Sequence, residues 1–348
     1  MRLFLMLTIL CFLRVGAAHA ASVIVAPSNA SGKAKARADL VCDGKDDQVE
    51  LHQSLTSAPR VSTMSDSAPN QQHERACYGR HSVEWLPGDY RLGDTLVIPD
   101  AADMAIQAEG AYFHYEQPEG DAIVIQGMNR CRYRLGTVET TSTGAAIRVK
   151  PGGDMPALMS ILSFTGLIGK NQKGTGLFIE PAIGVCTNRF EGTDISGFDT
   201  GVMFENADKG KGDTNWFWFS YIRLCNTCIW EKGRRVDDNV WYVNIDASLP
   251  GSTAARIGGT YGRWYIIMGA FGFEKTNNAV VLEPGAQHNV IEVHPPLEQF
   301  KWEDNSGNDT NVILSSMSAP LKGVRPPLPE KSPPSPDVAD AKDTADTL

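Results

Sequence analysis

Beyond its first twenty residues, the sequence lacks an apolar run long enough to cross a membrane, and it is poor in basic residues. It holds 32 Lys and Arg against 41 Asp and Glu, which gives a formal net charge of −9 at pH 7. An acidic surface repels nucleic-acid phosphates, so we expect no nucleic-acid partner, and we expect no membrane partner either. The same surface disfavours a strongly anionic polymer unless a basic groove or a bound cation intervenes.

The one long apolar run lies at the N-terminus. Arg2 precedes an apolar stretch over residues 3–13, and Ala18-His19-Ala20 has the small-x-small pattern of a cleavage site. This layout predicts a signal peptide over residues 1–20 and a secreted protein, extracellular or, in a bacterium, periplasmic. Residues 315–348 are rich in Pro, Ser, Ala and Asp and predict a flexible tail. The folded body is then expected over residues 21–314.

Six cysteines remain after the predicted leader. An even number in an exported protein permits up to three disulfides, and the sequence does not choose among the fifteen pairings. Cys225 and Cys228 have the spacing of a redox or zinc motif, but no second pair of ligands stands near them. We therefore favour a structural pair or buried thiols, and we predict no metal site.

A short apolar strand recurs along the body, whereas helical periodicity is missing. Taking one equivalent position in each copy, the steps along the chain are 24, 30, 25, 27, 26, 25 and 32 residues. Periods of this length indicate a solenoid. The equivalent positions are Ile123, Ile147, Leu177, Val202, Ile229, Ala255, Val280 and Val312.

A second type of strand falls between these copies and begins with Asn in four cases, at Asn188, Asn215, Asn239 and Asn289. Asn tolerates a left-handed backbone at a turn, and stacked Asn side chains can bond to one another along a ladder. Two or three short strands per repeat predict a parallel β-helix, in which each coil buries its inward side chains on the next. The alternatives are a β-sandwich or a propeller with irregular hairpins.

The N-terminal part of the body sharpens this prediction. The segment over residues 38–51 contains Asp43-Gly44-Lys45-Asp46-Asp47, and residues 83–90 and 95–99 read as strand, Pro-Gly-x-Tyr, strand. These motifs resemble the opening of the pectate-lyase-like (pectin lyase fold) superfamily. The resemblance implies an all-β protein, a right-handed single-stranded parallel β-helix with a short N-terminal capping helix. It also implies a carbohydrate ligand, because lyases, glycoside hydrolases, epimerases and sugar-binding tail proteins share that fold.

The expected capping helix follows the acidic motif. Asp46 is the expected N-cap, and Val49, Leu51 and Leu55 form an apolar stripe. We interpret Asp43, Asp46 and Asp47 as a structural turn and cap rather than as a catalytic or metal-binding group.

The resemblance carries no catalytic residue onto this chain. Asp237-Asp238 matches one motif of polygalacturonase-like hydrolases, but their Asn-Thr-Asp, Gly-His-Gly and Arg-x-Lys motifs are missing. The carboxylate set of calcium-dependent lyases and the Asp-Pro-His motif of epimerases are missing as well. No cofactor is identified, and Ca²⁺ enters only as an ion that such lyases use.

Alternation along the Asn-led strands predicts one column of outward side chains. A period of two sends Phe190, Phe217, Trp241 and Ile291 inward, and Glu191, Trp218, Tyr242 and Glu292 outward. The register of the fragment that contains Arg263 is ambiguous. The next outward positions are expected to be Thr193, Ser220, Asn244, Met268 and His294, with Asp194, Arg223 and Asp246 just beyond.

Aromatic rings stack on sugars and carboxylates bind hydroxyl groups, so this column predicts a glycan groove. The candidate substrate-binding residues are Glu191, Trp218, Tyr242, Arg263 and Glu292. For a lyase, the candidate catalytic residues are a base, His294, Tyr242 or Arg223, and an arginine to neutralise the uronate. A hydrolase would instead need two carboxylates about 5–10 Å apart.

The leading hypothesis is a secreted polysaccharide lyase that acts on a uronate-containing or similar glycan. One alternative is a non-catalytic surface or tail-type β-helix that binds glycan or protein, and another is a glycoside hydrolase on the same fold. A structural solenoid without a small-molecule site is the fourth interpretation. The expected partner is a polysaccharide, and the expected assembly is a monomer or a homotrimer.

Overall fold

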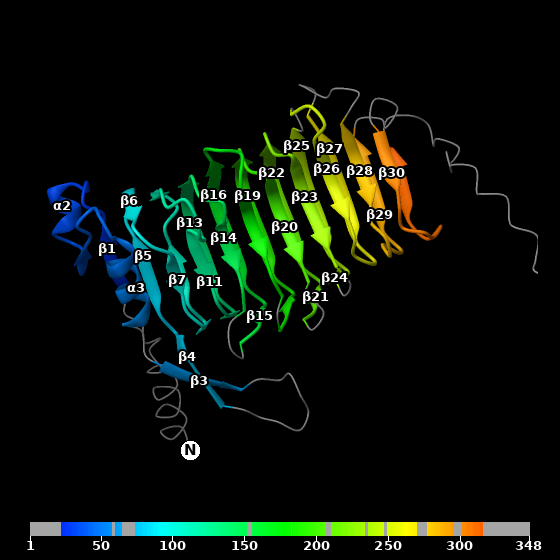
Figure 1. Ribbon diagram of the computed structural model, residues 1–348. Helices are drawn as coiled ribbons and strands as arrows, with labels where there is room; N and C mark the ends of the chain where they lie inside the picture. The colour runs from blue at the N-terminus through cyan, green and yellow to red at the C-terminus, as the bar shows by residue number, and fades with distance from the viewer. Residues whose placement is uncertain are drawn as a thin grey trace, which may run out of the picture.

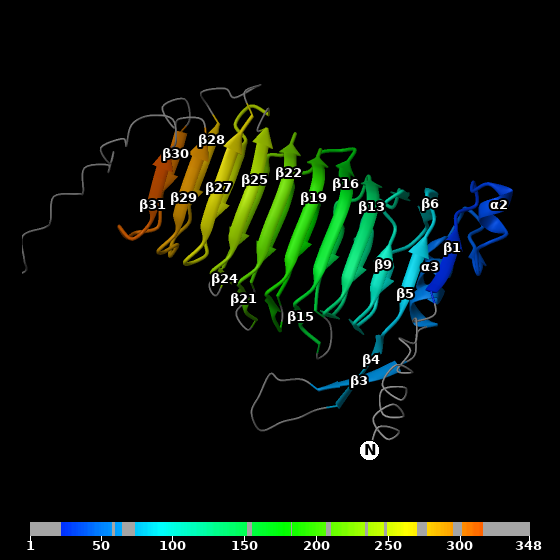
Figure 2. The same cartoon turned by 180° about the vertical axis from the view of Figure 1, so that it is seen from behind.

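The computed structural model describes residues 22–57, 60–64, 74–151, 155–181, 183–206, 210–233, 236–246, 249–269, 277–294 and 301–315. They form a β-solenoid of about eight turns that is mostly strand with very little helix. Two large sheets lie on opposite sides of the solenoid, and the views in Figure 1 and Figure 2 face one sheet each. The fold class predicted from the repeat is therefore confirmed.

Sheet 1 has fourteen strands, in the order β2-β1-β5-β9-β13-β16-β19-β22-β25-β27-β29-β31, with β10 also paired to β13 and β6 paired to β10. It consists of β1 (Ser22–Ala26), β2 (Leu40–Val41), β5 (Ser82–Trp85), β6 (Gly88–Leu92), β9 (Ala105–Gln107), β10 (Ala111–Tyr115), β13 (Arg132–Thr140), β16 (Ile161–Gly169), β19 (Arg189–Ser196), β22 (Trp216–Arg223), β25 (Val240–Asp246), β27 (Arg263–Met268), β29 (Val290–His294) and β31 (Val312–Ser315).

Sheet 2 has nine strands, β7 (Leu96–Ile98), β11 (Ile123–Ile125), β14 (Ala145–Val149), β17 (Thr175–Ile179), β20 (Thr200–Glu205), β23 (Thr227–Lys232), β26 (Thr253–Ile257), β28 (Asn278–Leu282) and β30 (Lys301–Asp304). Sheet 3 contains β3 (Arg60–Met64), β4 (Glu74–Gly79), β8 (Ala101–Ala102), β12 (Met128–Asn129), β15 (Ala157–Leu158) and β18 (Val185–Cys186). A separate pair joins β21 (Gly212–Asp213) to β24 (Val236–Asp237). The coils from β4 to β26 each pass through a short strand, sheet 1 and a strand of sheet 2, whereas the coils of β27 and β29 have only isolated bridges, at Thr260 and Gln287, in place of the short strand.

Parallel pairing stacks the repeat as predicted. The ladder of sheet 2 joins Ile123, Ile147, Leu177, Val202, Ile229, Ala255 and Val280, all of them fully buried. The last predicted member was wrong, because Val280 pairs with Trp302 of β30, whereas Val312 belongs to β31 of sheet 1. Among the described strands, only β3 and β4 pair in antiparallel fashion.

The predicted Asn ladder is present at the start of sheet 1. The Asn188 side-chain amide donates to the Asn215 side-chain oxygen at 3.2 Å, and Asn215 donates in the same way to Asn239 at 3.1 Å. The left-handed residue is the one before each Asn rather than the Asn itself, with φ between 53° and 59° at Thr187, Thr214, Asp238 and His288. Each Asn also bonds to a backbone carbonyl of a neighbouring coil, so the ladder fixes the turn into sheet 1.

Helix α3 (Gln48–Thr56) packs against the first strands of the solenoid, with Leu51 and Leu55 in the core. The short helix α2 (Gly32–Lys35) precedes it. Asp47 rather than Asp46 stands at the N-cap position of α3, and Val49 is exposed, so both expectations were wrong. The buried Asp47 carboxylate accepts from the backbone N–H groups of Gly44 and Arg91, which supports a structural role for the acidic motif.

No disulfide joins the six cysteines of the described residues, so the expected disulfides are not seen. Cys225 and Cys228 are fully buried, and burial raises the pKa of both thiols, that of Cys225 to about 12. Within the described ranges, no helix has both the length and the apolar character needed to span a bilayer. The predicted signal peptide and tail lie outside the described residues, apart from Ser315 at the end of β31.

Candidate functional site

The predicted outward column exists on sheet 1. Backbone register places Glu191, Trp218, Tyr242, Tyr265 and Glu292 side by side on five successive strands, β19, β22, β25, β27 and β29. Tyr265 fills the position that the sequence left ambiguous. The inward partners are buried as predicted, and Trp264 joins their stack.

The three aromatic residues of the column stack on one another. The rings of Trp218 and Tyr242 lie 4.7 Å apart at 11°, and those of Tyr242 and Tyr265 lie 5.3 Å apart at 29°. Their faces therefore cover each other, and mainly their edges point to solvent. The face of Trp218 on the β19 side has a carboxylate, Glu191, as its neighbour in the column instead of another ring.

A hollow of about 290 Å³ lies beside Trp218. Small side chains create it, because Ser163, Thr193 and Ser220 occupy outward positions on β16, β19 and β22. The remaining lining residues are Phe164, Arg189, Glu191 and Gly192. The hollow therefore combines one aromatic wall with hydroxyl groups, a carboxylate and a guanidinium group.

The two charged groups of the hollow neutralise each other. Arg189 and Glu191 lie two residues apart on β19 and form an ion pair, with 55% and 31% of their side chains exposed. Both remain accessible to a ligand, but the hollow presents little net charge.

Two of the three residues considered as catalytic are held by neighbours. The guanidinium group of Arg223 makes two hydrogen bonds to Asp194, at 2.9 and 3.0 Å. On the adjacent strand, burial raises the pKa of Asp246, and Arg223 opposes that shift. His294 Nε2 lies 3.0 Å from Glu292 Oε1.

The structure does not bring His294, Arg223 and Tyr242 together. His294 lies on β29, two strands from Tyr242, which is about 10 Å at the usual spacing between strands. Arg223 lies five residues beyond Trp218 on β22, which is about 16 Å along a strand. Glu191 and Glu292 are four strands apart, about 19 Å, which exceeds the separation that a hydrolase needs.

Arg263 flanks the column on β27, opposite Val240 and Val290. It is exposed, and no acidic side chain of the described residues forms an ion pair with it. The prediction that Met268 points outward was wrong. Met268 pairs with Ile245 in the buried row, and Ile267 takes the outward place next to His294.

A polar cluster at the other end of sheet 1 was missed from the sequence. The Tyr112 hydroxyl donates to Glu139 at 2.8 Å, Lys170 contacts the same carboxylate at 2.9 Å, and His114 lies 3.1 Å from Asp89. Burial and the bond to Glu139 raise the pKa of Tyr112 to about 12. The alternation of apolar and polar residues over 111–115 could have shown that Tyr112 and His114 point outward. It could not have shown that they meet Glu139 and Asp89, which lie on other coils.

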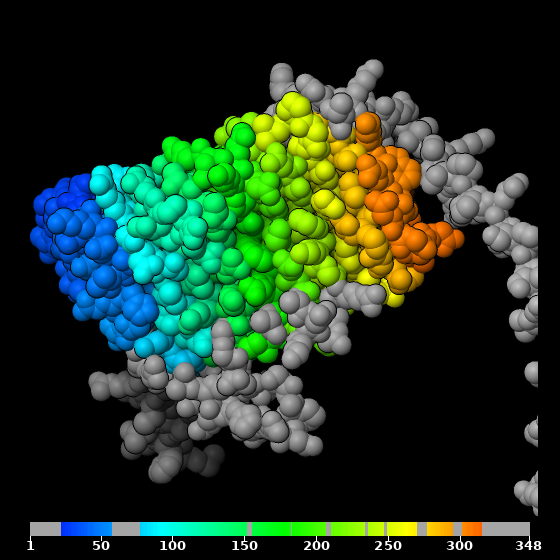
Figure 3. Space-filling model, in the orientation of Figure 1, coloured from blue at the N-terminus to red at the C-terminus, as the bar shows by residue number. Residues whose placement is uncertain are grey.

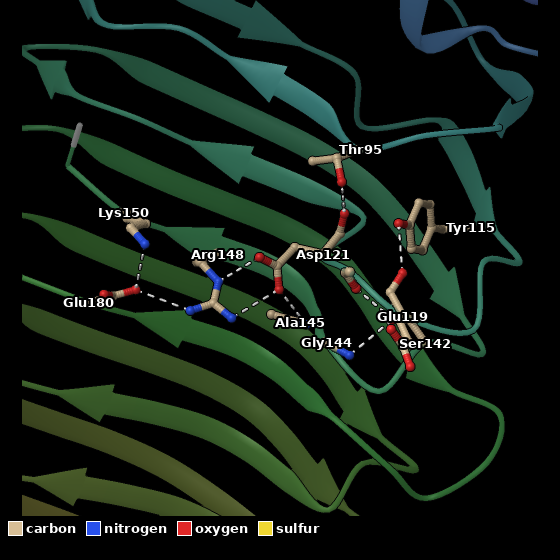
Figure 4. Close-up of polar contacts among 11 residues, drawn as sticks. Thr95, Tyr115, Glu119, Asp121, Ser142, Gly144, Ala145, Arg148, Lys150 and Glu180 are labelled. Atoms are coloured by element: carbon tan, nitrogen blue, oxygen red, sulfur yellow. Dashed lines mark hydrogen bonds and ion pairs between the residues drawn. The ribbon is translucent and has the colours of Figure 1, made fainter. Parts of the chain in front are cut away.

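The outer face of sheet 2 is arranged differently. Figure 4 shows Arg148 between Asp121 and Glu180, with distances of 2.6 and 3.1 Å between the charged atoms. Lys150 contacts Glu180 from the side. This face appears in Figure 3 as coils packed against each other in chain order.

One group among the described residues has the composition of a metal site. The ligand atoms of Cys42, Asp47 and Glu50 all lie within 4.8 Å of one another. Burial and the three nearby carboxylates raise the pKa of the Cys42 thiol, so this thiol is protonated in the absence of a cation. The carboxylate of Asp47 already accepts two backbone hydrogen bonds. We therefore assign no metal to this group.

In comparison with known proteins, no protein-family model, curated protein or solved structure matches this chain.

Proposed function

We propose that this protein is a secreted carbohydrate-binding protein that presents its binding site on the outer face of sheet 1. The hollow beside Trp218 carries the proposal. Its combination of one aromatic wall with converging hydroxyl, carboxylate and guanidinium groups is typical of sugar sites. The pectate-lyase-like resemblance and a right-handed course of the coils belong to the same proposal, as do the signal peptide and a monomeric or homotrimeric assembly.

Binding is better supported than cleavage. A lyase needs a base and a neutralising cation at one sugar unit, and His294, Arg223 and Tyr242 lie about 10 Å or more from one another. Only Tyr242 and Arg263, on the adjacent strands β25 and β27, lie closer, about 8 Å apart along the backbone. Arg223 is also committed to Asp194. The lyase hypothesis therefore rests on the family resemblance and on the neighbouring pair Tyr242 and Arg263, and no residue is assigned to hold Ca²⁺.

A glycan array probed with the mature chain tests the proposal. We expect the protein to bind selectively to a group of related glycans. The Trp218→Ala variant should lose this binding. The Trp230→Ala variant, which removes an aromatic side chain from the outer face of sheet 2, should retain it. Binding of no glycan would contradict the proposal.

The lyase hypothesis is tested by incubating the glycans that bind with the protein, with and without Ca²⁺, and following the ultraviolet absorbance of unsaturated chain ends. We expect no increase in absorbance.

A further inference from the structure

The aromatic ladder of Trp218, Tyr242 and Tyr265 has a directional end. Tyr242 has a ring on both sides, whereas Trp218 has a ring only on its β25 side. The hollow is lined by residues of β16, β19 and β22, so it opens onto the opposite side of the indole. The indole face on that side therefore borders the hollow and the Glu191 carboxylate instead of another ring, and Tyr242, itself stacked on Tyr265, packs on the opposite face.

The hollow is small. Its volume of about 290 Å³ is just below the usual range for ligand pockets, about 300–1,000 Å³, which favours a single sugar unit over a longer chain. Trp218 stands at one end of it along the solenoid axis. At the other end, the column continues from Ser163 to Arg134 on the neighbouring strand β13. The Arg134 side chain is half exposed and forms an ion pair with Glu109 at 3.3 Å. A sugar chain lying along the axis would meet both of these large side chains.

The polar groups favour a neutral ligand. The carboxylate of Glu191 accepts and the guanidinium group of Arg189 donates, so together they match two adjacent hydroxyl groups of a pyranose. Because the ion pair cancels its own charge, it offers no excess cation to a uronate. The hydroxyls of Ser163, Thr193 and Ser220 add neutral donors and acceptors.

We propose that the hollow binds one neutral pyranose unit, at a chain end or a branch, stacked on the face of Trp218 that borders the hollow. Arg189 and Glu191 contact its hydroxyl groups, and Tyr242 is a positioning residue that acts through the indole. This inference rests on the proposed function, and it assigns a neutral terminal unit where the family resemblance suggests a uronate within a chain.

Ligand-observed NMR titrations with methyl glycosides of glucose, galactose and mannose, and of glucuronate and galacturonate, test the assignment. We expect at least one neutral glycoside to bind at least tenfold more tightly than its uronate counterpart. Equal or tighter binding of the uronates would overturn the neutral assignment. If array glycans bind but no single glycoside does, the single-unit site is overturned while the proposed function stands.

Filling the hollow tests its location. Ser163→Trp should weaken binding at least tenfold while the ladder stays intact, and Thr193→Trp serves as a second variant if the first does not fold. Leu314→Trp is the matched control, because Leu314 lies in the same column beyond Glu292 and is exposed.

Tyr242→Ala tests the positioning role of this tyrosine. It should weaken binding several-fold and leave the Trp218 indole less ordered, which is measured as a loss of tryptophan fluorescence anisotropy. If a folded Ser163→Trp variant binds normally while Trp218→Ala does not bind, the ligand lies outside the hollow. The single-unit inference is then wrong, while the proposed carbohydrate-binding function stands.

Discussion

Two regions on the outer faces of sheets 1 and 2, one around Trp218 and one around Arg148, are built from the same kind of coil but use their side chains differently. On sheet 2, Arg148 bridges two carboxylates of neighbouring coils, and Trp230 packs under the guanidinium group of Arg256. On sheet 1, Trp218 is 52% exposed and borders a hollow. Coil stacking already stabilises the solenoid through its interior, so sheet 1 can leave part of its surface open for a ligand. We infer that sheet 2 is the structural face and sheet 1 the binding face.

The largest expected effect concerns the carboxyl group of Glu231, which sheet 2 places inside the solenoid. Glu231 of β23 is buried, with hydrogen bonds from the Trp241 indole and the Gly259 backbone. Burial raises the pKa of Glu231 from 4.5 to about 8, with Asp237 adding to the shift. The folded chain keeps this proton up to about pH 8, whereas the unfolded chain loses it above 4.5. Stability should therefore fall as pH rises through this window, by up to about 5 kcal/mol.

Glu231→Gln should remove most of that fall. Denaturant unfolding at pH 5 and pH 8.5 measures it as the change in the free energy of unfolding between the two pH values. A variant as pH-sensitive as the parent would show that another group is responsible. Glu180→Gln on the outside of the same sheet is the control, since that carboxylate is paired and partly exposed.

The next prediction compares two arginines. Arg148 is 22% exposed, and its removal leaves Asp121 and Glu180 without their main cation, so Arg148→Met should cost about 2 kcal/mol. Arg223 of sheet 1 is 50% exposed, and Arg223→Met should cost about 1 kcal/mol or less. Chemical denaturation of both variants measures the difference. Equal costs would remove the distinction between the two faces.

Effects of the same size are expected for the two outward tryptophans. Trp230→Ala should destabilise by about 2 kcal/mol, because it loses packing and cation–π contacts with Arg256 and Lys232. Trp218→Ala should cost about 1 kcal/mol, since it loses one stacked partner at an exposed position. Thermal unfolding of both variants checks the order. A larger loss at Trp218 would make the ladder a structural element rather than part of a binding surface.

The sequence predicted the ladders well because burial and strand alternation are local patterns. Ile147, Leu177 and Val202 could be aligned from their spacing alone. Val312 was assigned to the wrong sheet because the short apolar strands of the two sheets have similar sequences. The preceding residue, Asn311, marks the strand as part of sheet 1, because it accepts a hydrogen bond from the Asn289 side chain in the Asn ladder.

The site was predictable only in part. Alternation placed Glu191, Trp218 and Tyr242 in one column, but it could not show that the rings cover each other's faces. The hollow arises from small residues on three different coils, such as Ser163 and Ser220, and such residues give no signal in a single strand. The pairing of Arg223 with Asp194 joins residues 29 positions apart, so only the fold reveals that Arg223 is already engaged.

The central claim is that sheet 1, and not sheet 2, binds carbohydrate. Isothermal titration of the best array glycan into the mature protein, Trp218→Ala and Trp230→Ala tests it most directly. The account predicts at least tenfold weaker binding for Trp218→Ala and unchanged binding for Trp230→Ala. Unchanged binding in a folded Trp218→Ala variant, with binding lost in Trp230→Ala, would contradict it.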